Sequence, residues 1–171
     1  LNPERGTATV TPADAEQLTA LIAELMQSAA FNQGRTPVCD GIIYLWGLEV
    51  PSVPNFNPEL LAAQNTYSTY PLIALGQALL ANSAPGRLIV ATNTAQAVLG
   101  GEAPNPLAAA AWGAGRVLWY QELLANRGSL VDVALDERAG AEQHIQAATQ
   151  ILAELRANTQ VGEYEGEVAW R

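Results

Sequence analysis

The sequence contains no lysine, and it has only one histidine and one cysteine among its 171 residues. Its eight basic residues are all arginine and stand against 17 acidic residues, which leaves a net charge of −9. Because contacts with phosphates need clusters of lysine and arginine, this balance argues against a nucleic-acid partner and against an anionic membrane surface. The single cysteine, Cys39, allows no internal disulfide and indicates a reducing, cytoplasmic location.

Long apolar runs are also missing, so no segment is long enough to span a bilayer, and no signal peptide is recognisable. The first residue is Leu1 rather than methionine, from which we expect a piece of a larger polypeptide. Residues 1–171 suit a single domain with one core. Charged residues make up only 15% of the chain. This low fraction predicts that a partner covers part of the surface.

Apolar strands and amphipathic helices alternate along the chain. Runs typical of strands buried on both faces span 41–46, 86–92 and 129–135, and a last short strand is expected within 167–171. Helical spacing covers 11–30, a short segment from 58, then 71–80, 106–125 and 139–157. The alternation predicts an α/β fold, with a mostly parallel sheet of about four strands and helices on both faces.

Capping patterns mark where several helices begin. Thr11 before Pro12, Asn57 before Pro58 and Asn105 before Pro106 each place a polar cap ahead of a proline in the first helical position. The helix 139–157 is expected to carry one apolar stripe, made of Ala141, Ile145, Ala148, Leu152 and Leu155.

The stretch WGAGR, residues 112–116, raises the possibility of a dinucleotide site. Such a fingerprint needs G-x-G-x-x-G in the turn between a strand and a helix, where backbone N–H groups reach the pyrophosphate. Here Gly113 and Gly115 lie inside the helix 106–125, and Leu118 occupies the third glycine position. We therefore interpret these small residues as letting the helix pack close to the sheet.

Ligands of parallel α/β sheets bind beyond the carboxyl ends of the strands. In this sequence those positions are Trp46–Glu49, Thr92–Thr94 and Asp136–Glu137. Asp132, Asp136 and Glu137 could in principle do acid–base work, but capping of the next helix is the simpler role.

His144 is expected on a helix away from any strand end, near the edge of its apolar stripe, and Cys39 is expected to be a small buried thiol. The two make neither a metal set nor a catalytic pair. The four tryptophans, Trp46, Trp112, Trp119 and Trp170, are more typical of core or interface than of ligand stacking.

Five segments in order carry a resemblance: GIIYLWGLE, RLIVATNTAQAV, NPLAAAAWGAGRVLWYQEL, GSLVDVAL and a final EVAWR. Together they resemble the structural, non-catalytic subdomain of the ketoreductase domain of modular polyketide synthases, over essentially all of residues 1–171. The resemblance implies a truncated Rossmann-like, three-layer fold similar to short-chain dehydrogenases. The family's structural half usually begins one strand–helix unit earlier, so that unit is expected to be missing here.

In that family this half holds the catalytic half, which follows in the same polypeptide and carries the NADPH site and the Ser, Tyr and Lys residues. The resemblance aligns Trp112 and Arg116 with the Tyr-x-x-x-Lys pair of short-chain dehydrogenases, and Thr92-Asn93 with the end of the catalytic strand. It therefore implies a scaffold in a multienzyme, with no catalytic, cofactor or metal residue of its own. Its expected partners are the catalytic subdomain and other synthase domains.

Two other readings stay open. One is a scaffold in a module whose catalytic half is inactive. The other is a small independent α/β enzyme or ligand-binding domain that uses the strand ends near Glu49, Asn93 and Asp136. The helix 106–125, apolar almost all round, favours a scaffold because the sheet covers one of its faces and a partner would cover another.

Overall fold

The computed structural model describes residues 6–27, 39, 41–50, 58–66, 68–136, 138–157 and 166–171. Four parallel strands form one sheet in the order β1-β2-β3-β4. Their bounds are Gly41–Tyr44, Arg87–Asn93, Arg127–Val133 and Glu167–Ala169. The predicted α/β class, with a parallel sheet of this size, is confirmed.

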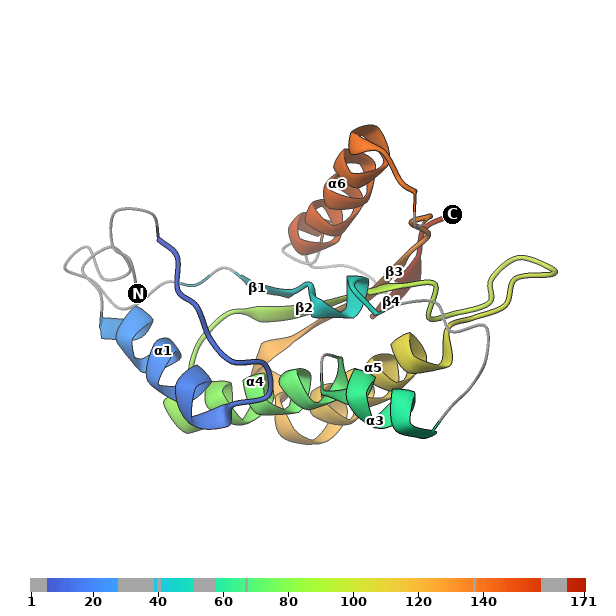
Figure 1. The fold of residues 1–171 in the computed structure, drawn as a ribbon. Coiled ribbons are helices and arrows are strands. Elements are labelled where there is room, and N and C mark those ends of the chain that lie inside the picture. Colours follow the sequence, from blue (N-terminus) through green and yellow to red (C-terminus); the bar gives the residue numbers. More distant parts are fainter. Residues whose placement is uncertain are drawn as a thin grey trace.

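Helices cover the two faces of the sheet unequally (Figure 1). One face carries α1, α3, α4 and α5, which span Ala15–Gln27, Pro58–Asn65, Thr69–Asn82 and Pro106–Val117. The opposite face carries α6, which spans Ala141–Ala157. Helices on both faces were expected from the sequence, and the structure confirms them.

The central strands are buried on both sides, which explains their unbroken apolar sequences. On β2, Leu88 and Val90 belong to the larger core beneath α4 and α5, whereas Ile89 and Ala91 belong to the smaller core beneath α6. All four side chains are completely buried. Because successive side chains of a strand point to opposite faces, one apolar run supplies both cores.

Some predicted boundaries were wrong. The first helix begins at Ala15, and its cap is Asp14 rather than Thr11, because the Asp14 carboxylate accepts the Gln17 N–H at 3.0 Å. The first strand ends at Tyr44, and Trp46 lies in a short 3₁₀ turn. The expected cap at Asn57 falls outside the described residues.

The cap at Asn105 is confirmed, since its side chain accepts the Leu107 N–H at 3.1 Å. The expected helix 106–125 is broken, however. After α5 the chain forms a wider π-type turn over Leu118–Glu122 and a 3₁₀ turn over Leu124–Asn126. A wide turn helps both Leu118 and Leu123 to reach α4 beside Gly76, where an added Cβ would lie 2.8 Å from Leu118 Cδ2.

The apolar stripe expected on α6 does not face the sheet as a whole. Ala147 and Ile151 are the buried residues of this helix, while Ile145 and Leu152 are 66% and 42% exposed. The stripe is wider than the contact of α6 with β2 and β3 can bury, because no second helix of the described chain shares this face (Figure 1). The predicted residues do share one face of the helix, but the residues that α6 buries against the sheet lie beside that face.

The two glycines of WGAGR differ in their surroundings. A Cβ on Gly115 would lie 2.5 Å from Leu130 Cδ2, so this glycine does allow α5 to pack close to β3. A Cβ on Gly113 would meet nothing within 4 Å. The packing interpretation is confirmed for Gly115 and is wrong for Gly113, which faces away from the sheet.

This difference predicts opposite effects of alanine. Gly113→Ala should raise the free energy of unfolding by about 1 kcal/mol, because alanine favours helix over glycine and no neighbour opposes it. Gly115→Ala should be less stable than Gly113→Ala by at least about 1 kcal/mol, because its methyl group overpacks against Leu130. Urea denaturation of both variants measures the difference, and equal shifts would contradict this packing.

Candidate functional site

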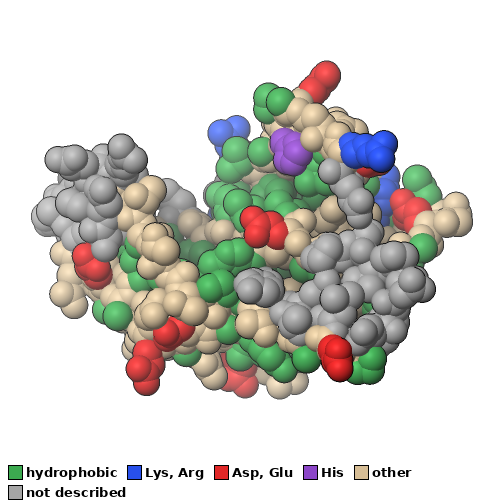
Figure 2. All heavy atoms as spheres, viewed as in Figure 1, with side chains coloured by type: hydrophobic (Ala, Val, Ile, Leu, Met, Phe, Trp, Pro, Cys, Tyr) green, Lys and Arg blue, Asp and Glu red, His purple; other side chains and the backbone are tan. Residues whose placement is uncertain are grey.

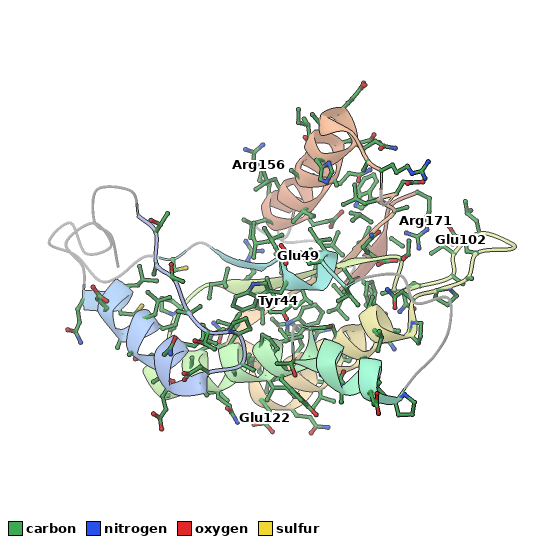
Figure 3. The ribbon with its side chains drawn as sticks, viewed as in Figure 1. Tyr44, Glu49, Glu102, Glu122, Arg156 and Arg171 are labelled. Carbon is green, nitrogen blue, oxygen red and sulfur yellow. The ribbon has the colours of Figure 1, made fainter. Side chains whose placement is uncertain are left out.

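Three predicted strand-end segments meet at one pocket of about 460 Å³. From the predicted positions it takes Glu49 after β1, Asn93 and Thr94 at the end of β2, and Asp136 after β3. Glu49, on the segment that follows β1, is labelled in Figure 3. The convergence of these positions is confirmed, whereas Glu137 lies outside the described residues.

Two asparagine side chains hold the walls of this pocket together. The Asn93 amide donates to the Leu135 carbonyl at 3.0 Å and accepts the Leu135 N–H at 2.9 Å, which ties β2 to the segment after β3. The Asn105 amide donates to the Val50 carbonyl at 3.3 Å while its oxygen caps α5. Both amides thus serve the structure of the pocket.

The remaining polar lining is ionisable, and sequence reasoning missed part of it. Arg138 and His144 join Glu49 and Asp136 at the pocket. His144 was expected away from the strand ends, which was wrong: the connection from β3 to α6 is short, so the first turn of α6 lies directly beside the strand end. Its Nδ1 lies 3.0 Å from the Gly140 carbonyl oxygen.

Cys39 and His144 are not brought together. Cys39 precedes β1, and its thiol lies 3.5 Å from the Gly41 carbonyl oxygen, at the amino end of the sheet. His144 lies at the carboxyl end. Within the described ranges, no cluster of three His, Cys, Asp or Glu side chains could hold a metal ion.

An apolar groove of about 280 Å³ continues from the pocket along α6. Leu48, Leu135 and His144 line both hollows. The groove is completed by Ile43, Leu45, Ala147, Ala148, Ile151 and Leu152. Figure 2 shows hydrophobic side chains gathered beneath α6, with the single histidine at their edge.

The two aspartates within and after β3, Asp132 and Asp136, have different roles. Asp136 accepts the Arg138 N–H at 2.8 Å within the turn that precedes α6, which begins at Ala141, so Asp136 does not cap that helix and the capping interpretation was wrong for it. Asp132 was grouped with it, which was wrong. Asp132 lies within β3, is fully buried, and accepts hydrogen bonds from the Thr92 hydroxyl at 2.7 Å and the Ala95 N–H at 2.7 Å.

Asp132 also forms an ion pair with Arg171, with Nη2 and Oδ2 2.9 Å apart. The Arg171 side chain is only 11% exposed, and its Nε donates to Glu102 at 2.7 Å. Figure 3 shows Arg171 and Glu102 side by side. This network joins β2, β3, the segment after β4 and the loop before α5.

Trp112 and Arg116 do not line the pocket. Trp112 is 3% exposed and belongs to the core beneath the sheet. Arg116 Nε and Nη2 each donate to a carboxylate oxygen of Glu167 on β4 at 2.6 Å. These hydrogen bonds hold the pKa of Glu167 below its ordinary value. The pair therefore links α5 to the core and to β4.

No family model matches the sequence. No curated protein matches it either. Among solved structures, the chain is similar to a multidomain structure comprising adenylation, ketoreductase and pseudo-Asub parts of a keto acid-selecting NRPS module. The TM-score is 0.68 at 14% identity, over 94% of this chain and 12% of that one. The likeness confirms the Rossmann-like α/β fold, and this chain spans only about an eighth of the solved one.

None of the helices in the described part of the chain combines the length and the apolar character needed to cross a membrane.

The buried position of Asp132 predicts a large effect of neutralising it. Asp132→Asn should lower the free energy of unfolding by roughly 3 kcal/mol, because the buried guanidinium of Arg171 loses its closest buried counter-charge. Glu167→Gln is the matched control: its pair with Arg116 is partly exposed, at 36% and 48% of the two side chains. It should cost less than about 1 kcal/mol. Similar losses in the two variants, measured by chemical denaturation, would contradict the central role of Asp132.

Proposed function

We propose that this chain is the structural half of a ketoreductase domain in a modular synthase. It would pack on and stabilise the NADPH-dependent half that reduces β-ketoacyl groups in polyketide biosynthesis. The observation that carries the proposal is the structural role of Trp112 and Arg116. The resemblance aligns these two residues with a catalytic Tyr-x-x-x-Lys pair. One is buried in the core and the other is held by Glu167.

The chemistry of these two residues supports the same function. Tryptophan has no acidic hydroxyl that could donate a proton to a ketone oxygen. Arginine keeps its proton, since its pKa lies above about 12. The proton donor and the NADPH would therefore come from the catalytic half, and the cofactor would bind there rather than at the pocket of this chain.

The apolar side chains that the helices leave exposed also fit a chain that is part of a larger multidomain protein. The sequence argument assigned the second face of α5 to a partner, but α4 covers much of it. Large apolar side chains nevertheless remain exposed along one groove, where Leu45 and Leu152 are 50% and 42% exposed. Surfaces of this kind are typical of interfaces between domains.

A second candidate function rests on the strand-end pocket. Its ionisable lining adjoins the apolar groove beneath α6, and ligands of parallel α/β sheets bind at this edge. A ligand with a polar head and an apolar body would fit this pair of hollows. Under this alternative the chain would be an independent α/β enzyme or binding domain. The remaining alternative, a scaffold beside an inactive catalytic half, assigns no ligand to this pocket.

The scaffold proposal predicts that Trp112 and Arg116 affect folding rather than chemistry. Trp112→Phe and Arg116→Lys, made in the polypeptide that carries both halves, should leave turnover per folded molecule nearly unchanged. Each should reduce stability, because the first loses core contacts and the second loses a bidentate ion pair. Steady-state reduction by NADPH, normalised to the folded fraction, measures this. A large loss of turnover with normal folding and cofactor affinity would contradict the proposal.

A further inference from the structure

The pocket at the carboxyl ends of the strands opens directly into the apolar groove along α6. The two hollows measure about 460 and 280 Å³, and Leu48, Leu135 and His144 line both. Volumes in this range are typical of small-molecule sites, and ligands of parallel sheets bind at this edge. The start of α6 lies on one side of the hollows, and β1 with the turn after it lies on the other (Figure 1). Together the hollows have room for one elongated ligand.

Part of the pocket lining has a strained backbone. Thr94 has a φ of 53°, in the left-handed region that β-branched residues rarely adopt. Its N–H donates to the Val133 carbonyl at 2.9 Å, and its carbonyl accepts the Asn105 N–H at 2.7 Å. Such a backbone persists only where the surrounding structure imposes it, and it is concentrated at ligand sites. The strand ends therefore hold this part of the pocket in a fixed conformation.

The charged groups of the lining take little part in the fold. Among the described residues, the Glu49 carboxylate and the Arg138 guanidinium form neither a hydrogen bond nor an ion pair. Asp136 uses one carboxylate oxygen to accept the Arg138 N–H at 2.8 Å. His144 directs Nδ1 to the Gly140 carbonyl oxygen, 3.0 Å away, which leaves Nε2 for a ligand. The pocket thus offers two carboxylates and a guanidinium whose charges the fold does not neutralise.

We propose that the two hollows bind an α-amino acid with a large apolar side chain. The ammonium group of the ligand lies at Glu49 and Asp136, its carboxylate at Arg138, and its side chain in the groove. Both charges belong at one end of the ligand, because His144 is the only ionisable residue in the lining of the groove. This inference names a ligand class for the second candidate function, rests on the pocket of that candidate, and does not depend on the scaffold role.

Amphiphiles with a single charge match the lining less well. A fatty acid would bring its carboxylate beside Glu49 and Asp136, in a chain whose net charge is already −9. An aliphatic amine would bring its positive charge beside the Arg138 guanidinium. A zwitterion meets a counter-charge for each of its ends. Because these side chains are exposed to water, we expect a dissociation constant on the order of 1 mM.

Titrations of the 171 residues, followed by the NMR shifts of backbone amides, test the ligand class. The probe is norleucine, and its matched control is the isomer 6-aminohexanoic acid, which carries the two charges at opposite ends. Hexanoic acid lacks the ammonium group, pentylamine lacks the carboxylate, and glycine lacks the apolar tail. Norleucine should bind about tenfold more tightly than each of these four. The scaffold role would bring a partner domain against the same groove, so the chain is tested without one.

Variants of the lining test the site. Arg138→Gln and Glu49→Gln should each weaken norleucine binding by about three- to fivefold. Arg138→Gln should not weaken the binding of pentylamine, which has no carboxylate. Leu152→Ser should weaken norleucine binding and leave glycine unaffected. Leu124→Ser changes an exposed leucine that lines neither hollow, and it should bind norleucine as the parent sequence does. All four side chains are exposed, so we expect every variant to fold.

Several results would overturn the proposal. If norleucine does not bind, or if Leu124→Ser weakens it as much as the lining variants do, the site is wrong. If 6-aminohexanoic acid, hexanoic acid or pentylamine binds as tightly as norleucine, the ligand class is wrong. Each of these results leaves the scaffold function standing, because that function is tested by turnover and stability in the polypeptide that carries both halves.

Discussion

The structure depends on one buried carboxylate more than on any other polar group. Asp132 lies inside the sheet, where an isolated charge would be strongly unfavourable, and it is compensated by the Thr92 hydroxyl, backbone N–H groups and the guanidinium of Arg171. Through these partners it fixes the loop after β2 and the segment after β4 against β3. Removing the Asp132 carboxylate would leave the Thr92 hydroxyl and the Ala95 N–H without the acceptor that they share inside the protein.

The two faces of the sheet are covered unequally because different numbers of helices pack on them. Four helices share one face and enclose a large core, whereas α6 alone lies on the other and leaves an apolar groove beside it. Along this groove the molecule exposes aliphatic side chains, among them Leu45 and Leu152. The scaffold role proposed above would bring a partner domain against these side chains.

The sequence predicted features that depend on local pattern. The three predicted apolar runs became β1, β2 and β3 because alternate residues of each run belong to the two cores, and Asn105 capped its helix as expected. Features set by tertiary contacts could not be predicted from the sequence. The orientation of α6 depends on what else covers its face, and the role of Asp132 depends on Arg171, which lies 39 residues away along the chain. Nothing in the local sequence around His144 signals that it lines the pocket.

The central claim is that this chain is a scaffold whose apolar surface belongs against a catalytic half. Fluorescence of a hydrophobic dye tests it most directly, measured on the 171 residues and on the longer polypeptide that continues through that half, with the association state of each followed by sedimentation. The account predicts dye binding or self-association for the shorter chain and neither for the longer one. A shorter chain that is monomeric, silent to the dye and as stable as the longer polypeptide would contradict it.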